Sequence, residues 1–455
     1  FRKPIKTENR YSMKKIILVS INLCFFFLTN AQEKNAAISL EEAINYAIEH
    51  SYNTRTSKND IKSAYEKIKE TTSSGLPQIE GKVDYQNWIQ QQVNLSDFNG
   101  DGIDEELIFG KRQGINAFAT VRQLLFDGSF LIAVKASKTY LDISVMANEK
   151  IELLTRENVI NAYGNVLVTE NSITILKGNI DILTKSLSDA KKIYKNGFNE
   201  EEDIEQLEIT LGNLISELNG MKRMNEISYK MLNMSIGNPI ETKLVLTDSL
   251  DGLVEKNTNL SFFSKTFNAS NHIDYKIAEN DTESKRLLIR LEQSKALPSL
   301  SAFINYGYSG FSNSFSFFES NQKWFASSQF GVSLTIPIYS SLFRASKTAQ
   351  AKIAFETSNI KLTETQQRLS LLADKAKSDY QLSIENYTTA KKNVGLAERI
   401  EKKQRIKFFE GISSSFDLLQ AQNQLYAQQQ NYIQSMLNVI SKKATLENAL
   451  NLPIK

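Results

Sequence analysis

The feature that most restricts the fold is a long stretch without proline that carries a heptad pattern. There is no proline between Gly128 and Lys195, and its second half has apolar residues at alternating steps of three and four. These are Ile173, Leu176, Ile180, Leu183, Leu187, Ala190 and Tyr194. This spacing lines one apolar seam along a helix and requires a coiled-coil partner. At 1.5 Å per residue, a helix of about 68 residues is roughly 100 Å long, far longer than a globular domain needs.

A second seam follows after a short turn at Gly197. Its residues are Ile204, Leu207, Leu211, Leu214, Leu218 and Met221. Two adjacent seams joined by a short turn predict an antiparallel hairpin of helices. The same pattern predicts a second hairpin, from Ser340 to Phe409 and from Asp417 to Leu450.

The sequence motifs of the first half of the chain recur in the same order in the second half, which indicates an internal duplication. Leu76-Pro77 recurs as Leu297-Pro298, and the turn with Gly197 and Asp203 recurs with Gly411 and Asp417. We therefore predict two structural repeats, 32–240 and 268–455, with 241–267 as a connector. Each repeat should begin with a helix. In the first repeat this helix spans Ile38 to Ser74, with Ser39 and Glu42 as a capping box.

Each repeat also contains two segments in which apolar and polar residues alternate. The predicted strands are about 77–92 and 114–126 in the first repeat and about 298–310 and 328–339 in the second. About ten alternating residues match the length of a transmembrane β-strand. Trp88 and Trp324 lie in this part of the sequence, and aromatic residues near strand ends are typical of membrane interfaces. The other interpretation is a soluble sandwich with an aromatic core.

Transmembrane strands would have a consequence for assembly. Four strands cannot close a barrel, and an open sheet edge cannot face lipid, because its backbone groups would have no hydrogen-bond partners. If these strands span a membrane, several chains must contribute to one barrel.

The N-terminal segment is predicted to be removed. Residues 1–12 precede Met13 and are interpreted as an over-extended reading frame, whereas residues 13–31 have the basic start, apolar stretch and small final residue of a secretory signal. A retained membrane anchor is the other interpretation.

Removal of residues 1–31 takes away six Lys/Arg and one Glu, which lowers the formal net charge from +3 to −2. A net charge of −2 does not indicate a nucleic-acid-binding protein, which would be expected to be basic. The one cysteine, Cys24, lies in the signal, which excludes a disulfide scaffold.

The sequence resembles the TolC-like outer-membrane efflux family over about residues 36–453. The resemblance is carried by the duplicated order, by "GLP" and "ALP" before the strands, by "LLFDGS" between strand and helix, and by the turns "YKNGFNEEEDIEQL" and "FFEGISSSFDLLQAQ". It implies an α+β membrane protein that forms a homotrimer. A shared twelve-strand barrel in the outer membrane would continue into a helical coiled-coil barrel in the periplasm. The family's proteins are passive exit ducts, coupled to an inner-membrane pump through a periplasmic adaptor.

The resemblance also implies roles for the two hairpin tips. Asp203 and Asp417 match the family's aspartates six residues after the tip glycine, and threefold symmetry would gather them into a ring that constricts the tunnel and favours cations. Gln206 and Gln420 stand where a second aspartate is often found, which weakens this prediction. The other interpretation is that both carboxylates complement the dipoles of their own helices.

The tip turns themselves are predicted to dock the adaptor. Gly197 and Gly411 suit turns that require a positive φ. Phe198 and Ile412 are apolar at positions predicted to face water, and exposed apolar patches mark interaction sites.

One loop resembles part of a calcium-binding motif. Asp97, Asn99 and Asp101 match the opening of an EF-hand loop, but Ile108 replaces the glutamate at its twelfth position. Weak calcium binding is one interpretation, and a turn rich in Asn-Gly and Asp-Gly is the other.

Other classes of function find little support. The sequence has only His50 and His272 as histidines and lacks a P-loop, a nucleophile elbow and a dinucleotide fingerprint, so no enzyme activity and no cofactor are expected. A structural or adhesive coiled-coil protein of the cell envelope is the alternative function. It would explain the heptads but would leave the paired strands and the duplication without a role. The cargo, the pump class and the adaptor stay open.

Overall fold

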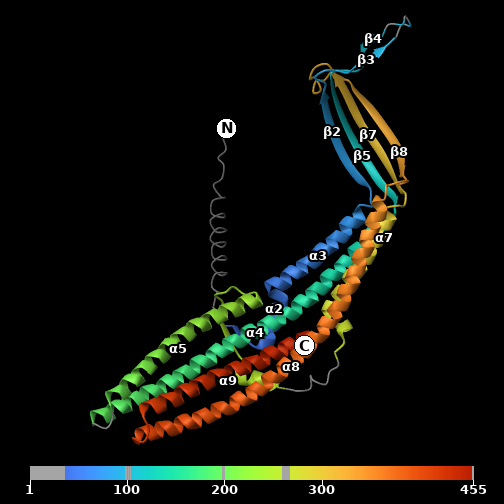
Figure 1. Ribbon diagram of the computed structural model, residues 1–455. Coiled ribbons are helices and arrows are strands. Elements are labelled where there is room, and N and C mark those ends of the chain that lie inside the picture. Colours follow the sequence, from blue (N-terminus) through green and yellow to red (C-terminus); the bar gives the residue numbers. More distant parts are fainter. Residues whose placement is uncertain are drawn as a thin grey trace, which may run out of the picture. The chain divides into compact units, whose positions relative to one another are not determined.

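The computed structural model describes residues 36–97, 100, 102, 104–196, 200–258 and 267–452 (Figure 1). The predicted reading-frame extension, signal and cleavage site lie outside the described residues, as do Asn99, Asp101, Gly197 and Phe198. The described chain divides into two compact units. Unit 1 contains residues 36–52, 155–258 and 378–445, and unit 2 contains the rest.

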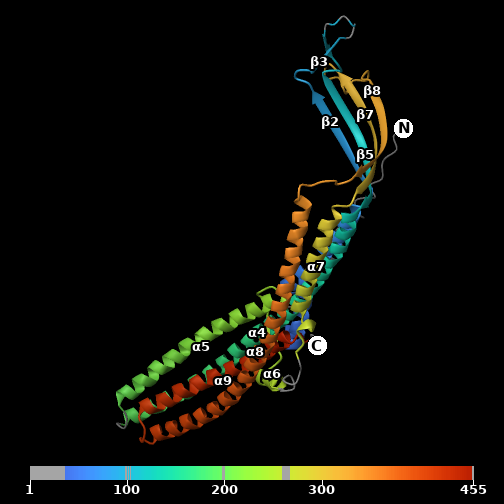
Figure 2. The same cartoon turned by 45° about the vertical axis from the view of Figure 1, so that its right-hand side comes forward.

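Unit 2 contains an antiparallel sheet whose strands follow the order β2-β5-β7-β8. Figure 2 shows these four strands side by side. They are β2 (Gln78–Asn87), β5 (Gln113–Asp127), β7 (Ser299–Ser312) and β8 (Trp324–Thr335). A separate hairpin, which the sequence pattern did not predict, is formed by β3 (Val93–Ser96) and β4 (Glu105–Ile108). Each repeat thus contributes two neighbouring strands to one sheet.

The last strand differs from its predicted range of 328–339. It begins at Trp324 and ends at Thr335, and Ser299 pairs with Thr335 at the end of the ladder. The reason lies in the partner strand, because β7 begins at Ser299 directly after Pro298. Pro337 has no N–H to donate to a ladder. Apolar and polar residues therefore still alternate at 336–339, where β7 no longer offers residues for pairing.

Unit 2 also contains several helices or parts of helices. They are α3 (Tyr52–Ser73), α7 (Ile273–Ser294), the short η2 (Ala269–Asn271), and the sheet-proximal parts of α4 (Gly128–Lys195) and α8 (Phe343–Phe409). Side chains tie neighbouring helices together: Ser57 Oγ donates to Asn148 Oδ1 at 2.6 Å, and Thr282 Oγ1 donates to the Ser358 carbonyl at 3.4 Å. The 68-residue length of α4 confirms the predicted rod.

Unit 1 contains the two helical hairpins and a small connector. Its other elements are β1 (Ala36–Ile38), α2 (Leu40–His50), α5 (Glu201–Ile236), β6 (Leu244–Leu246), α6 (Leu250–Asn257) and α9 (Ser415–Ala449). The capping box of Ser39 and Glu42 is present. The predicted continuous helix from Ile38 to Ser74 is wrong, because β1 ends at Ile38 and Ser51 has an extended backbone with ψ of 150°. Gly237, in the left-handed region at φ 88°, packs so closely against His50 that a Cβ there would lie 2.3 Å from the His50 carbonyl oxygen.

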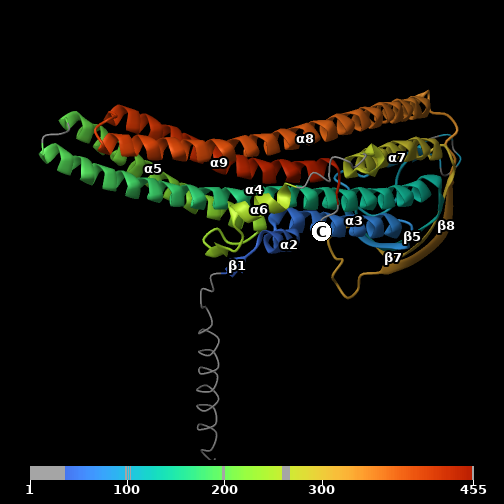
Figure 3. The ribbon, with the colours of Figure 1, turned by 90° about the horizontal axis from the view of Figure 1, so that it is seen from below.

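The predicted seams form the core between the hairpins. Seam residues of α4 and α5 cluster with residues of α8 and α9. The buried members are Leu176, Leu183, Leu187, Ala190, Ile204, Leu207, Leu214, Phe408 and Leu418. Asn179 Nδ2 on α4 donates to Gln429 Oε1 on α9 at 2.9 Å. Figure 1 shows α4 and α9 between α5 and α8 in this unit, and Figure 3 shows the same helices from below.

Candidate functional site

The sheet has one apolar face and one polar face, because successive side chains of a strand alternate between faces. The pairing register aligns apolar residues of all four strands on one face. They include Ile79, Val83, Tyr85, Ile115, Ala117, Val121, Leu300, Ala302, Ile304, Phe330, Val332 and Leu334. The apolar face is exposed, with 76% of Ile79 and 69% of Phe330 accessible to solvent. A sheet of this kind suits a wall between lipid and water.

The opposite face carries charged and hydrogen-bonded side chains. Lys82 Nζ lies 3.0 Å from Asp84 Oδ1, and Arg122 lies 3.6 Å from Glu80 on the neighbouring strand. Ser309 Oγ donates to Asn116 Oδ1 at 2.7 Å. This face is chemically suited to a water-filled lumen.

Both outer strands of the sheet have an unpaired edge. Among the described residues, strand β2 pairs only with β5, and β8 pairs only with β7. Every residue of β2 is exposed. Rows of free N–H and C=O groups are templates for pairing with another strand. Both edges of the sheet are therefore available to pair with further strands.

Two glycines on the polar face allow aromatic rings to cover the neighbouring strand. Gly307 pairs with Phe118, and Gly331 pairs with Phe303. A Cβ at Gly307 would lie 2.2 Å from the Ala117 carbonyl oxygen, and a Cβ at Gly331 would lie 2.4 Å from the ring of Phe303. The backbone of β5 makes glycine necessary at Gly307, whereas a side chain at Gly331 would require the Phe303 ring to move.

Aromatic side chains gather where the β7–β8 loop crosses the end of the sheet. Phe317 in this loop is only 3% exposed. Its ring centroid lies 6.1 Å from that of Tyr85 on β2 and 6.4 Å from that of Trp324 on β8. The predicted aromatic enrichment at strand ends is thus a contiguous cluster, in the position expected for an interfacial belt.

At the tip of the second hairpin, Asp417 caps its own helix. Its Oδ2 accepts hydrogen bonds from Ser414 N at 3.3 Å, Ser414 Oγ at 2.9 Å and Ser413 Oγ at 3.2 Å. Ser414 Oγ accepts in return from Asp417 N at 3.2 Å, which completes a capping box. The hydrogen bonds from Ser414, first from its side chain, hold the pKa of Asp417 below its usual range. The Ser-x-x-Asp spacing was a sequence signal for this cap.

Asp203 occupies the related position on α5 but has a different environment. The N-cap residue Glu200 makes no side-chain capping bond. Among the described residues, the Asp203 carboxylate has no hydrogen-bond or ion-pair partner. Ser415 Oγ donates to Gln206 Oε1 at 3.1 Å, which brings the starts of α5 and α9 together. Asp203 and Asp417 thus have equivalent sequence positions but different environments. Among the described residues, hydrogen bonds hold the carboxylate of Asp417 and none holds that of Asp203.

The described tip turn presents apolar side chains to solvent. Gly411 has a φ of 69°, and Ile412 N donates to the Lys407 carbonyl at 2.9 Å, as in a Schellman motif. Ile412 is 74% exposed, and Phe416, which the sequence analysis overlooked, is 66% exposed. Together they form an apolar tip surface.

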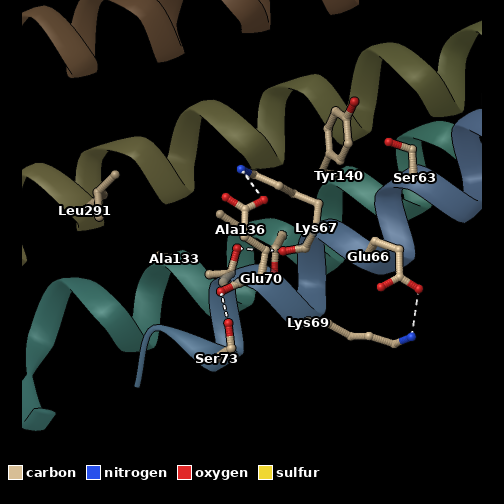
Figure 4. Close-up of a pocket in the computed structure, with 12 residues that line it drawn as sticks. Ser63, Glu66, Lys67, Lys69, Glu70, Ser73, Ala133, Ala136, Tyr140 and Leu291 are labelled. Carbon is tan, nitrogen blue, oxygen red and sulfur yellow. Dashed lines mark hydrogen bonds and ion pairs between the residues drawn. The ribbon is translucent and has the colours of Figure 1, made fainter. Parts of the chain in front are cut away.

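The remaining features of the described chain offer little for catalysis. Residues of α3, α4 and α7 line a groove of about 810 Å³, and Figure 4 shows their side chains. Its charged residues are neutralised by local ion pairs, Lys67–Glu70 at 2.8 Å and Lys69–Glu66 at 2.7 Å. No group of three or more metal-ligating side chains occurs in the part of the chain that the structure describes.

The first aspartate of the predicted calcium-binding loop, Asp97, stabilises the turn of that loop. Asp97 accepts from the backbone N–H of Gly100 at 2.7 Å and of Gly102 at 2.9 Å. Both glycines have positive φ, 77° and 85°. The Asp97 carboxylate thus serves the turn in this structure, and calcium binding with Asn99 and Asp101 stays a prediction.

Residues 269–452 match the sequence profile of a family described as outer membrane efflux protein. Over these residues, which we call the efflux domain, the chain is similar to that family. This match supports the family resemblance found in the sequence. The efflux domain belongs to a family of transport proteins and not of enzymes.

Solved structures extend the likeness beyond the efflux domain. The outer membrane protein VceC from Vibrio cholerae has 14% identity and a TM-score of 0.68, with coverage of 91% of this chain and 97% of VceC. The CmeC outer membrane channel of Campylobacter jejuni has 15% identity and a TM-score of 0.69, with coverage of 90% and 85%. The MtrE outer membrane channel of Neisseria gonorrhoeae has 16% identity and a TM-score of 0.66, with coverage of 90% and 88%. At these identities the likeness establishes the fold, across both repeats. The search of curated proteins found no match.

No helix in the described ranges is both long enough and apolar enough to span a membrane.

Proposed function

We propose that this protein is a passive exit duct of the outer membrane, built from three copies of the chain. Each copy would contribute four strands to a twelve-strand barrel and two helical hairpins to a periplasmic tunnel. An inner-membrane pump, joined through a periplasmic adaptor, would supply the energy. The exposed, apolar tip surface of Ile412 and Phe416 would contact the adaptor, together with Gly197 and Phe198 of the other turn.

The observation that carries this proposal is the four-stranded sheet with one apolar face and two open edges. In lipid, each unpaired backbone group costs several kcal/mol. A sheet with β2 and β8 unpaired is therefore unstable alone in a bilayer, and pairing β2 of one copy with β8 of the next removes both edges. Repetition of this step around an axis closes a barrel, whose polar faces then line the lumen.

We expect native mass spectrometry in mild detergent to detect three copies of the chain. The physical reason is the edge pairing, which a single copy cannot satisfy. Membrane fractionation of the same cells should place the protein with outer membranes. A folded single copy that inserts into bilayers would contradict the shared barrel, and recovery without detergent would favour the alternative of a structural coiled-coil protein.

The two tip aspartates should differ when each is mutated. Because the carboxylate of Asp203 has no partner among the described residues, we expect Asp203→Ala to reduce the cation preference of single channels and to raise their conductance. Because Asp417 caps α9, we expect Asp417→Ala to cost about 1 kcal/mol of stability and to change selectivity less. Reversal potentials under a salt gradient in planar bilayers, together with thermal melts, separate the two effects. Equal loss of selectivity in both variants would show that Asp417 leaves its cap in the assembled duct.

A further inference from the structure

The methionines of this chain are concentrated in one short stretch of α5. The chain has seven methionines, and four of them are Met221, Met224, Met231 and Met234. Their sequence spacing is M-x-x-M, and it occurs twice in the C-terminal half of this helix. The concentration is therefore a property of this segment and not of the composition of the whole chain.

Most of these methionines do not belong to the core of the helical hairpins. Met224, Met231 and Met234 are 52%, 59% and 64% exposed. On the same stretch of α5, the buried positions are filled by the hydrocarbon side chains of Leu232 and Ile236, which are fully buried. The chain thus places thioether sulfurs where they contact solvent and uses sulfur-free side chains where the helix packs.

The two methionines of each M-x-x-M pair can reach one small ligand together. Residues three apart on a helix are neighbours, with Cβ atoms about 5–6 Å apart. Methionine has three rotatable bonds, so its Sδ atom can adjust to a ligand. Met231 and Met234, the second pair, are both exposed and can turn both sulfurs to one ion. In the first pair, Met221 is partly buried against the hairpin core, which leaves Met224 as its exposed member.

Charge also distinguishes the two pairs. The first pair encloses Lys222 and Arg223, which are exposed and would repel a bound cation. The second pair encloses two uncharged residues. Lys230, which precedes the second pair, has its Nζ atom 2.9 Å from Glu241 Oε1, so its charge is balanced locally. The second pair is therefore the better site for a cation.

We propose that Met231 and Met234 bind a soft monovalent cation, copper(I) or silver(I), through their Sδ atoms. Thioether sulfur is a soft donor and prefers copper(I), whereas calcium and magnesium prefer oxygen ligands. Other soft sites are scarce. The one cysteine, Cys24, lies in the predicted signal, and the part of the chain that the structure describes has no group of three His, Cys, Asp or Glu side chains placed to hold a metal. The proposed site does not depend on the duct proposed above.

Methyl NMR of the purified protein in detergent tests the site directly, with isotope-labelled methionine methyl groups and silver(I) as the probe. We expect silver(I) to shift the signals of Met231 and Met234 at concentrations about tenfold lower than those that shift Met221 and Met224, because of the charges beside the first pair. The signal of Met436, which is 3% exposed, should not shift. Zinc, which prefers harder ligands than thioethers, should shift none of these signals.

Paired leucine substitutions separate sulfur from packing, because exchange of methionine for leucine conserves side-chain volume. We expect Met231→Leu/Met234→Leu to weaken copper(I) binding about tenfold in competition with a coloured copper(I) chelator, because both soft ligands are lost. The matched control, Met221→Leu/Met224→Leu, should keep the tighter site. Both variants should melt at the temperature of the unmodified protein.

An exposed histidine, His50, is the rival ligand, since imidazole also suits copper. We expect His50→Asn to keep the silver(I) shifts of Met231 and Met234. Loss of binding in this variant, with binding retained in Met231→Leu/Met234→Leu, would overturn the thioether site. Equal shifts of all exposed methionine signals at one silver(I) concentration, or no shift at all, would overturn it too. These outcomes would leave the duct proposal unaffected.

Discussion

Replacement of Gly307 by valine should prevent the sheet from forming. A Cβ at this position would lie 2.2 Å from the carbonyl oxygen of Ala117 and 2.9 Å from the Cα of Phe118, and both atoms belong to the backbone of β5. A side chain could move aside, but these atoms cannot move without opening the β5–β7 ladder, which joins the strands of the two repeats. We expect no folded oligomer, measured as loss of heat-resistant bands in gels and of the trimer in native mass spectrometry.

Gly81→Val is the matched control for this experiment. Gly81 lies in β2 of the same sheet, and no atom lies within 4 Å of the place where its Cβ would be. Valine also has a high propensity for strands. We expect this variant to assemble normally. Normal assembly of Gly307→Val would show that the close approach between β5 and β7 is not required.

Truncation of Leu183 should produce a large loss of stability in the helical hairpins. Leu183 is fully buried in the cluster that joins α4 and α5 with α8 and α9. Removal of a buried leucine side chain costs about 2–5 kcal/mol, because apolar transfer energy is lost and a cavity remains. We expect Leu183→Ala to lower the midpoint of thermal unfolding by several degrees, followed by circular dichroism at 222 nm in detergent.

The neighbouring residue supplies the control for the leucine variant. Ile182 is on the same helix, one position away, and is 38% exposed. Its truncation leaves no enclosed cavity, so we expect Ile182→Ala to cost less than about 1 kcal/mol. Equal losses for the two variants would contradict the assignment of the seam.

The long helices could be predicted because their determinants are local and repeated. The stretch from Gly128 to Lys195 lacks proline and repeats one apolar spacing, and α4 has these same bounds. The capping box of Ser39 and Glu42 was equally predictable, since its two partners are three residues apart. The alternation of Leu300, Ala302 and Ile304 indicated which face of β7 is apolar, and this face does align with Ile79 and Phe330.

The tertiary structure decided where the strands end and what the tip carboxylates do. A strand extends only as far as its partner, so β8 ends at Thr335 opposite Ser299, although the alternation in the sequence continues to Tyr339. Asp203 and Asp417 have equivalent positions in the duplicated sequence, but only Asp417 has serines placed to complete a cap.

By itself, the sequence determined the length and seams of the helices and the apolar face of the sheet, because periodic spacing translates directly into faces. Strand limits, the glycine contact of Gly307 with β5, and the unequal roles of Asp203 and Asp417 depended on the tertiary structure. The physical reason is that each of these properties depends on a contact between segments that are distant in the sequence, or on the exact geometry of one turn. The residues next to a given residue in the sequence do not specify which segment it will contact.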